Sequence, residues 1–334
     1  MRVILDAMGG DEAPRVTVAG AVEAARGGLA VLLVGREAEV RAELARHPGA
    51  ASLPLELLAA PEVIEMGEHP AQAVRQKREA SINVAMRALK EGRGEALYSA
   101  GNSGAVMAAA LFGLGRLEGV HRPAIGAVLP LLEKRCLLVD IGANADCEPQ
   151  DLVQFAQMGA AYMAAVYGIA RPRVGLISNG EEATKGNALV QATFPLLEQS
   201  GLDFAGNIEG KDLTRGAVDV AVCDGFTGNV MLKLGEGLQE LMVALLRRTL
   251  SEKLHYRLAG AVLRPGLRAA LQRLDYTEYG GAPLVGVRGA VFIGHGRSNA
   301  RAIASGLRAA AAAAQAGVVE KLASGLRATL AGAT

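Results

Sequence analysis

The chain has no tryptophan, few other aromatic residues and almost no net charge. Phe, Trp and Tyr together make up 4% of its 334 residues, and 35 Lys and Arg face 34 Asp and Glu. Nucleic-acid-binding surfaces usually combine a basic excess with aromatic side chains on which bases stack. Because both features are missing, we expect no nucleic-acid partner.

Cysteine is scarce as well. The three cysteines lie at positions 136, 147 and 223, so no CxxC motif is present, and an odd number argues against a disulfide framework. Hydrophobic residues nevertheless make up 51% of the chain, which is enough to bury a large core. We therefore expect buried, reduced cysteines in a cytoplasmic protein.

Long apolar runs and leader segments are also lacking. The uncharged stretches 96–115 and 152–170 contain Ser, Asn, Gln and Tyr, which makes both too polar for a lipid-spanning helix. The first residues, MRVILDAMGGDEAP, contain no apolar signal region with a small-residue cleavage site. The sequence predicts no transmembrane segment.

Several motifs of nucleotide and metal chemistry are absent. No GxxxxGK[ST] sequence occurs, no GxGxxG follows the first predicted strand, and no HExxH is present. The segment Gly101–Ala105 differs from a nucleophile elbow at its fifth position, which argues against a serine hydrolase. We therefore expect neither a cofactor nor a metal.

Short apolar runs rich in Val, Ile and Leu alternate with helix-length segments. This alternation predicts an α/β protein with a largely parallel sheet covered on both faces, folded as a single domain over 1–334 that could divide into two lobes. The Ala-rich segment 309–316 predicts a closing helix. Strands are predicted over 2–5, 30–34, 55–60, 96–99, 124–130, 135–142, 173–178 and 218–225, and helices over 14–26, 36–47, 70–90, 103–114, 151–167 and 186–199.

Turns rich in Gly, Asn, Asp and Ser follow these strands. Glycine lets the backbone approach a ligand, and the helix that follows each turn offers free N–H groups to an anion. An ordinary capped turn is the alternative for each one, but their repeated position predicts that they meet at one sheet edge around an anion. The predicted phosphate- or substrate-binding residues are Asp6, Gly9, Gly10, Gly101, Asn102, Ser103, Gly104, Asn144, Asn187, Asp224, Gly228 and Asn299.

Three residues are catalytic candidates. Lys185 stands between Thr184 and Gly186 at a predicted helix start, where it can hold an anion as a point charge, although it could also be a solvated surface lysine. His295 between two glycines can bind phosphate or donate a proton, or can be a plain turn residue. Asn229, at the start of another helix, is a candidate oxyanion donor.

The segment 236–275 predicts an amphipathic helical hairpin. Leucines recur at helical spacing on both sides of an apolar stretch, 258–263, which we interpret as the bend. An apolar tip surrounded by arginines suggests contact with an anionic lipid surface, a buried tip in a dimer interface is the alternative, and both could hold. The residues predicted to contact a membrane or a carrier protein are Leu258, Val262, Leu263, Arg264 and Arg268.

With these motifs the sequence resembles the bacterial phosphate acyltransferase (PlsX) family. The matching stretches run in order along nearly the whole chain: LDAMGGDEAP at 5–14, SAGNSGA at 99–105, DIGAN at 140–144, GEEATKGN at 180–187, GNIEGKD at 206–212, DVAVCDGFTGNVMLK at 219–233, YGGAPLVGV at 279–287 and HGRSN at 295–299. The LDAMGGDEAP and DGFTGNV stretches are the most specific.

The resemblance implies transfer of a fatty acyl group from acyl-acyl carrier protein to inorganic phosphate, which gives acyl phosphate for phospholipid synthesis. It implies a homodimer with a three-layer α/β/α fold like that of isocitrate and isopropylmalate dehydrogenases, bound peripherally to the inner face of the membrane. A membrane glycerol-phosphate acyltransferase is a possible downstream partner. Other interpretations are a phosphotransacetylase acting on coenzyme A thioesters, a hydroxyacid dehydrogenase and a non-enzymatic membrane scaffold.

Overall fold

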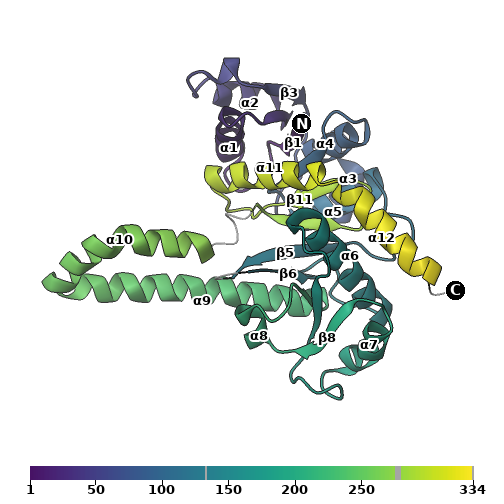
Figure 1. The fold of residues 1–334 in the computed structure, drawn as a ribbon. Coiled ribbons are helices and arrows are strands. Elements are labelled where there is room, and N and C mark those ends of the chain that lie inside the picture. Colours follow the sequence, from purple (N-terminus) through teal and green to yellow (C-terminus); the bar gives the residue numbers. More distant parts are fainter. Residues whose placement is uncertain (132–133, 275–279, 333–334) are drawn as a thin grey trace.

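The computed structural model contains one mixed sheet of eleven strands with helices on both faces (Figure 1). It describes residues 1–131, 134–274 and 280–332. The order of the strands across the sheet is β3-β2-β1-β4-β11-β10-β5-β6-β9-β7-β8. In chain order the elements are β1 (Arg2–Asp6), α1 (Arg15–Arg26), β2 (Ala30–Gly35), α2 (Glu37–Leu44), the 3₁₀ turn η1 (Ala50–Ser52), β3 (Leu55–Ala59), α3 (Pro70–Gln76), α4 (Ser81–Lys90), β4 (Ala96–Ser99), α5 (Ser103–Gly113), β5 (Ala124–Pro130), β6 (Arg135–Val139), α6 (Pro149–Tyr167), β7 (Arg173–Ile177), α7 (Ala188–Glu198), β8 (Asp203–Ile208), α8 (Gly210–Arg215), β9 (Val220–Val222), α9 (Gly225–Glu252), α10 (Leu254–Leu274), β10 (Ala282–Val285), β11 (Ala290–Ile293), α11 (Ala300–Gln315) and α12 (Val318–Gly332).

Side chains of the sheet alternate between two cores, one on each face. In β1, Val3 and Leu5 belong to the core shared with α1, α6, α11 and α12, whereas Ile4 packs with α4 and α5 on the opposite face. A smaller cluster under α8 and the start of α9 continues that second face. The predicted three-layer α/β/α fold is confirmed, because a sheet with two apolar faces buries both under helices.

The sheet is largely parallel, as predicted, but its two halves run in opposite directions. Seven of the ten strand pairings in the described residues are parallel. The antiparallel pairs β11–β10, β10–β5 and β5–β6 lie in the middle and reverse the direction. Strands β1 to β5 and β11 therefore run one way, and β6 to β10 run the other way.

This reversal corrects the prediction that all the polar turns meet at one sheet edge. The turns after β1, β4 and β11 lie at the carboxyl edge of one half, and the turns after β6, β7 and β9 lie at the opposite edge. The physical reason is the antiparallel pairing at the centre, since carboxyl ends of strands share an edge only within a parallel set.

The two sets of turns still approach each other across the middle of the sheet. Ile125 in β5 pairs with Leu284 in the centre of β10, and its backbone N–H donates to Oδ1 of Asp140 at 3.0 Å. Asp140 directly follows β6, so the carboxyl end of β6 lies beside the start of β5 and close to the centre of the whole sheet. The turn after β6 therefore opens toward residues that follow β4 and β11.

Helix boundaries follow local capping chemistry. α6 begins with Pro149 behind a capping box between Glu148 and Asp151, and it ends at Gly168, whose φ is +70°. α11 begins after Asn299, whose side chain accepts from the backbone N–H of Ala302 at 2.9 Å. The predicted closing helix is confirmed as α11, which is longer than predicted and packs along α1.

The predicted helix over 70–90 is wrong, because the chain forms two helices, α3 and α4. Ala80 pairs with Glu62 in an isolated β-bridge, which draws the chain out of the helix. The side-chain amide of Asn83 donates to the carbonyl groups of Val74 at 2.9 Å and Lys77 at 2.8 Å, and so satisfies the end of α3. Strands β8, β10 and β11 and helix α8, each between four and six residues long, were not predicted, and neither was the final helix α12 of 15 residues.

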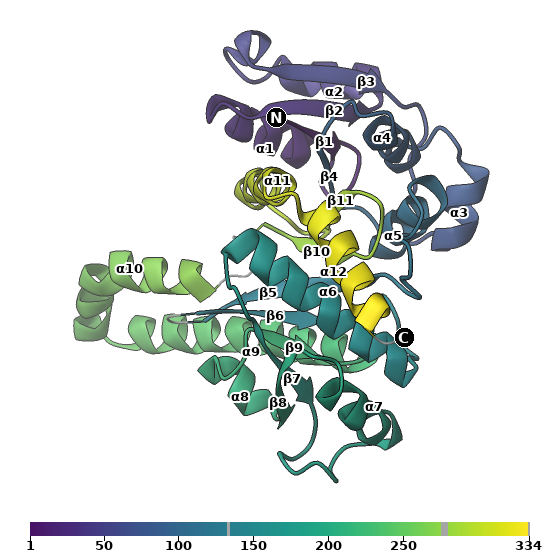
Figure 2. The ribbon, with the colours of Figure 1, turned by 45° about the vertical axis from the view of Figure 1, so that its right-hand side comes forward.

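The hairpin α9–α10 projects from the body of the molecule (Figures 1 and 2). The two helices meet at Lys253, so the prediction of a bend at 258–263 is wrong. That stretch lies inside α10 because Leu and Ala favour helix, and α10 continues through Pro265. Of the predicted hairpin 236–275, residue 275 lies outside the described residues.

Within the described ranges, no single helix is long and apolar enough to cross a membrane. One pair of helical segments, Ala300–Gln315 with Val318–Leu326, passes that test jointly, by length and composition only, with a bend of 52° at the break.

Candidate active site

A cavity of about 240 Å³ lies where the two halves of the sheet meet, and we call it the junction cavity. Segments that are far apart in the sequence line it: the ends of β4 and β11, the strand β5, the turn after β6 and the first turns of α9. Its lining residues are Tyr98, Ser103, Ile125, Ala127, Val128, Ile141, Gly142, Asn229, Leu232, Lys233, Glu236, Gly281, Ala282, Ile293, Gly294, His295 and Ser298.

The junction cavity combines an apolar lining with a polar one. Ile125, Val128 and Leu232 are among its aliphatic side chains, while hydroxyl, amide, ammonium, carboxylate and imidazole groups provide the rest. A cavity with few polar groups among aliphatic ones suits a ligand with an apolar chain and a charged or polar head.

Three of the predicted site residues meet in this cavity with their side chains: Ser103, Asn229 and His295. Ser103 is the first residue of α5, and Asn229 lies in the first turns of α9, so both are near helix N-termini. A Cβ placed on Gly142 would lie 3.5 Å from Nδ2 of Asn229, which puts the Asn229 amide beside the turn after β6.

His295 lies between a backbone amide and a lysine. The backbone N–H of Arg297 donates to Nδ1 at 3.1 Å, and Nε2 lies 3.4 Å from Nζ of Lys233. Lys233 in turn donates to Oε2 of Glu236 at 2.8 Å. Burial, followed by the positive charge of Lys233, lowers the pKa of His295 below its ordinary value of 6.5, so the ring is mostly neutral near pH 7.

Tyr98 forms one wall of the cavity and stays neutral. Burial raises the pKa of its hydroxyl to about 12, while a hydrogen bond with Ser298 opposes the shift. The ring fits because glycines face it: a Cβ on Gly306 would lie 2.1 Å from the ring, and one on Gly294 would lie 2.2 Å from the hydroxyl oxygen.

The turn after β6 is held by Asp140. The buried carboxylate accepts from the backbone N–H of Ala143 at 3.1 Å and of Asn144 at 2.7 Å, and from the Asn144 side chain at 3.0 Å. The Asn144 amide also donates to the carbonyl group of Pro123 at 2.8 Å. Burial raises the pKa of Asp140, opposed by these hydrogen bonds. The structure therefore places Asn144 beneath the turn and outside the junction cavity.

Four predicted binding residues serve as N-caps. Asn102 accepts from the backbone N–H of Ala105 at 3.1 Å, Asn187 from Val190 at 2.9 Å, Asp224 from Thr227 at 2.8 Å, and Asn299 caps α11 as described above. None of the four lines the junction cavity. Their contact with substrate stays a prediction.

The turn after β1 packs against the turn after β4. Asp6 is buried and accepts from the hydroxyl group of Ser99 at 2.8 Å and the backbone N–H of Met8 at 3.2 Å. A Cβ on Gly9 would lie 2.7 Å from the backbone nitrogen of Gly101, and one on Gly10 would lie 3.3 Å from the carbonyl oxygen of Gly296. These glycines allow the turns to touch, which brings the segments after β1, β4 and β11 together. Asp6, Gly9, Gly101 and Asn102 border a space of only about 10 Å³, too small for phosphate.

The turn after β7 faces a different cavity. A space of about 360 Å³ between the starts of α7 and α9 is lined by Asn187, Asp224 and Thr227 among others. Lys185 is exposed on the adjoining loop and lines neither this cavity nor the junction cavity. Gly228 lies in the first turn of α9 and packs tightly against the end of β6, since its Cβ would lie 1.9 Å from the carbonyl oxygen of Asp140. The structure thus does not bring Lys185 to Asn229 and His295, and its catalytic role stays a prediction.

Four further residues that were not predicted from the sequence line the junction cavity: Lys233, Glu236, Tyr98 and Ser298. Lys233 and Glu236 lie one turn apart on α9 behind Asn229, at positions i+4 and i+7, and so share its helix face. This shared helix face could have identified Lys233 and Glu236 as neighbours of Asn229 from the sequence. Tyr98 could not have been identified from the sequence, because an aromatic residue in a buried strand is typical of a hydrophobic core.

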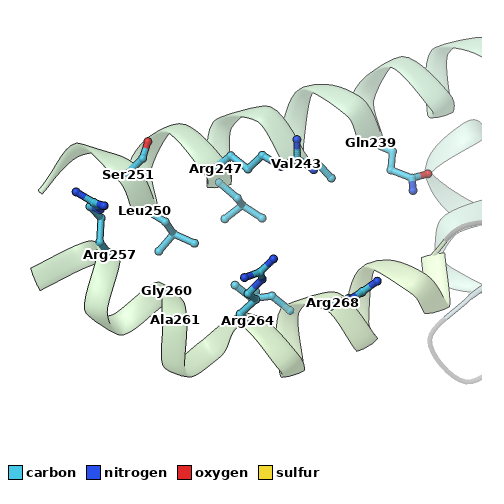
Figure 3. A pocket seen from close by; sticks show the side chains of 12 residues that line it. Gln239, Val243, Arg247, Leu250, Ser251, Arg257, Gly260, Ala261, Arg264 and Arg268 are labelled. Atoms are coloured by element: carbon cyan, nitrogen blue, oxygen red, sulfur yellow. The ribbon is translucent and has the colours of Figure 1, made fainter. Parts of the chain in front are cut away.

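A groove leads from the junction cavity along α9 to the hairpin. Glu236, His295 and Ser298 also line a neighbouring space of about 540 Å³, which in turn shares Gln239, Val243 and Arg247 with a larger space of about 880 Å³. This larger space lies between α9 and α10 (Figure 3) and we call it the hairpin groove. Its lining is Gln239, Val243, Leu246, Arg247, Leu250, Ser251, Arg257, Gly260, Ala261, Arg264, Leu267 and Arg268.

The residues predicted to contact a membrane or carrier fall into two groups. Arg264 and Arg268 line the hairpin groove, where their side chains face α9 (Figure 3). Leu258, Val262 and Leu263 do not line it and are 64%, 80% and 55% exposed. The charged and the apolar residues of α10 therefore serve different surfaces.

Among the described residues, three carboxylates are close enough to share a cation: Glu181, Glu209 and Asp212. Lys211 already forms ion pairs with Glu181 and Glu209 at this exposed position. The cluster lies on α8 and the loop after β7, and none of the three lines the junction cavity.

The chain is similar in sequence to phosphate acyltransferases and in fold to a phosphotransacetylase. Residues 1–321 match the family described as fatty acid synthesis protein. A phosphate acyltransferase of Anaeromyxobacter sp. (strain K) is 51% identical over 321 residues, which cover 96% of this chain and 89% of that protein. Among solved structures, a phosphotransacetylase from Streptococcus pyogenes has a TM-score of 0.64 at 18% identity, covering 95% of this chain and 94% of its own. A 4-hydroxythreonine-4-phosphate dehydrogenase from Klebsiella pneumoniae has a TM-score of 0.56 at 16% identity, covering 94% and 98%. These two structures support the fold alone.

Proposed function

The chain belongs to the fatty acid synthesis protein family, so it is an enzyme that transfers acyl groups, and we propose that it moves a fatty acyl group from acyl-acyl carrier protein to inorganic phosphate in the junction cavity. The product is an acyl phosphate for phospholipid synthesis. The observation that carries the proposal is the cavity's lining, in which Ser103, Asn229 and His295 occur together with aliphatic side chains.

The chemistry requires positioning and charge stabilisation. A phosphate oxygen attacks the thioester carbonyl carbon, and the tetrahedral intermediate breaks its C–S bond to release acyl phosphate and the carrier's thiolate, which takes up a proton. Phosphate is already nucleophilic at neutral pH, and a thiol with a pKa of about 8.5 leaves readily as thiolate. The protein must hold phosphate about 3–3.5 Å from the carbon and donate hydrogen bonds to the oxyanion. We assign these tasks to the N-terminus of α5 at Ser103, the amide of Asn229 and the imidazole of His295.

An acidic carrier protein fits the hairpin groove by charge. Four arginines, Arg247, Arg257, Arg264 and Arg268, line the groove, which continues through shared residues to the junction cavity. A carrier seated on these guanidinium groups can extend its thioester-bearing arm along α9 toward His295. The aliphatic lining of the junction cavity then receives the first part of the acyl chain.

We further propose a homodimer through α9. Leu234, Leu238, Leu241 and Leu245 recur at helical spacing and are each at least 50% exposed. A contiguous exposed stripe of this kind on a long helix marks a protein interface. A second copy of the chain is the occupant that the family resemblance implies.

The outer apolar residues of α10 suit a lipid surface. Leu258, Val262 and Leu263 lie on α10 within ten residues of Leu254, its first residue, which is 71% exposed. Shallow insertion of such side chains gives peripheral binding from the cytoplasmic side. That location would deliver acyl phosphate to a membrane glycerol-phosphate acyltransferase.

The test is an assay of the product with two donors. We expect purified protein incubated with palmitoyl-acyl carrier protein and phosphate to form acyl phosphate, trapped as a hydroxamate by hydroxylamine. Palmitoyl-coenzyme A serves as the comparison donor. Higher kcat/KM with the coenzyme A thioester would favour a phosphotransacetylase, and no hydroxamate with either donor would overturn the proposed function.

A further inference from the structure

The side chains of Lys233 and His295 lie next to each other in the junction cavity. They are 62 positions apart in the sequence, on α9 and on the turn after β11, yet Nζ and Nε2 lie 3.4 Å apart. Both also line the cavity in which Ser103 and Asn229 lie. The protonation of these two nitrogen atoms decides whether either one can accept a hydrogen bond from the other.

The backbone decides the tautomer of His295. The N–H of Arg297 points at Nδ1 at 3.1 Å, and a backbone N–H can only donate. Nδ1 is therefore the unprotonated nitrogen of a neutral ring, and the proton is on Nε2. The lowered pKa of His295 agrees with a neutral ring.

The ammonium group of Lys233 is also a donor and cannot accept. It has three protons, and one of them forms a hydrogen bond to the carboxylate of Glu236, with Nζ 2.8 Å from Oε2. The N–H of His295 and the ammonium group therefore face each other as two donors. An anionic oxygen placed against both atoms would complete the arrangement, since two donors 3.4 Å apart can each lie at hydrogen-bond distance from it.

We propose that Lys233 and the Nε2–H group of His295 together bind an oxygen of inorganic phosphate, the acyl acceptor. This inference rests on the proposed function for the identity of the anion. A compact ammonium charge suits a full negative charge better than the weaker dipole of a thioester carbonyl group. The pair thus holds the nucleophile, which leaves the Asn229 amide to donate to the oxyanion of the intermediate.

The experiment measures phosphate binding and turnover separately. Wild type, Lys233→Met and Lys233→Arg are titrated calorimetrically with inorganic phosphate in the absence of thioester, and then assayed with palmitoyl-acyl carrier protein. We expect Lys233→Met to raise the Kd and the KM for phosphate at least 10-fold and to change the KM for the carrier less than 2-fold. Lys233→Arg, which keeps the charge, should recover part of the affinity.

Histidine variants test the second donor. His295→Gln offers an amide N–H near the position of Nε2, whereas His295→Ala removes the donor, so the alanine variant should bind phosphate more weakly than the glutamine variant. Lys90→Met is the matched control, because Lys90 is exposed at the end of α4 and lines none of the cavities described here. Its Kd for phosphate should equal that of wild type.

The outcomes separate this inference from the proposed function. An unchanged Kd and KM for phosphate in Lys233→Met, with wild-type acyl transfer, would overturn the pair as a phosphate site and leave the transferase intact. Phosphate binding that depends on Lys233, in a protein that forms no acyl phosphate, would support the site and overturn the transferase. Melting temperatures of all variants establish that they are folded.

Discussion

At the scale of single residues, asparagine shows why one residue type can be interpreted in two ways. Asn102, Asn187 and Asn299 follow strands and precede helices, and each side chain accepts a backbone N–H of its own helix. Asn229 lies further into its helix than the cap Asp224, so its amide is available to the junction cavity. Position relative to the cap therefore separates a structural asparagine from a candidate donor.

Gly228 should be indispensable for packing and so for the placement of Asn229. In Gly228→Ala the new Cβ would lie 1.9 Å from the Asp140 carbonyl oxygen, so α9 must shift. We expect a loss of about 1–3 kcal/mol in the free energy of unfolding, measured by urea denaturation, together with reduced turnover.

Gly237→Ala is the control for this prediction. Gly237 lies in the same helix with nothing within 4 Å of a built Cβ, and alanine favours helix by about 1 kcal/mol. Equal stability changes in the two variants would contradict the steric argument.

Asp6 should make stability fall as pH rises. Burial raises the pKa of its carboxyl group above the ordinary value of 3.8, so the folded state holds a proton that the unfolded state has already lost. The free energy of unfolding therefore decreases as the pH rises from 3.8 to the folded-state pKa, by at most about 1.4 kcal/mol for each pH unit, and the loss persists at higher pH.

Asp6→Asn tests this sign. The amide cannot ionise, so in urea titrations the stability of the variant relative to wild type should improve as the pH rises above 3.8, until the folded-state pKa of Asp6 is passed. Because the other groups titrate in both proteins, they cancel in the difference. A difference that is independent of pH would show that Asp6 titrates normally.

At the scale of elements, the hairpin separates two roles that the sequence had merged. Three of the four arginines that line the groove and the exposed aliphatic residues outside it belong to the same helix, α10, but lie on different surfaces. The periodicity predicted a pair of helices in this segment, although α9 begins earlier, at Gly225, and α10 begins at Leu254. It did not locate the bend, because apolar residues suit a helix, a turn buried in an interface and a lipid-inserted tip equally well.

Reversing the groove charges should weaken the carrier and spare the membrane. We expect Arg264→Glu with Arg268→Glu to raise the KM for acyl-acyl carrier protein about 10-fold or more, with unchanged binding to anionic vesicles in flotation assays. Leu258→Asp with Val262→Asp should have the converse effect, loss of vesicle binding with a normal KM.

Arg248→Glu is the matched charge control for the groove. Arg248 is exposed on α9, pairs weakly with Glu252 and does not line the groove. If Arg248→Glu raised the KM for the carrier as much as the groove variant, general electrostatic attraction would replace the docking site.

At the scale of the whole molecule, the exposed stripe on α9 predicts the assembly. Burying a leucine side chain contributes about 1.5–3 kcal/mol, so Leu238→Lys with Leu245→Lys should raise the dimer Kd by about 100-fold or more. Light scattering at micromolar concentration should show a dimer for wild type and a monomer for the variant.

Leu254→Lys is the control for assembly. Leu254 is exposed at the far end of the hairpin, where α10 begins, and its replacement should not alter the mass. A wild-type protein that scatters as a monomer would contradict the proposed dimer.

The sequence by itself determined the layered α/β fold, most of the longer strands and helices, and three of the residues that line the junction cavity. Hydrophobic periodicity, caps and glycine turns are local properties, so they can be interpreted without knowing what lies nearby. Ser103, Asn229 and His295 were identified in this way, and the structure places all three in one cavity.

Only the tertiary structure decided which turns share a cavity. The antiparallel strands β5 and β10 reverse half of the sheet, which separates the turn at Lys185 from the turn at His295 and brings Lys233 to the latter. The direction of a strand depends on pairing between distant segments. A four-residue strand such as β10 has too short a pattern of apolar residues to be predicted from the sequence, and its direction cannot be predicted either.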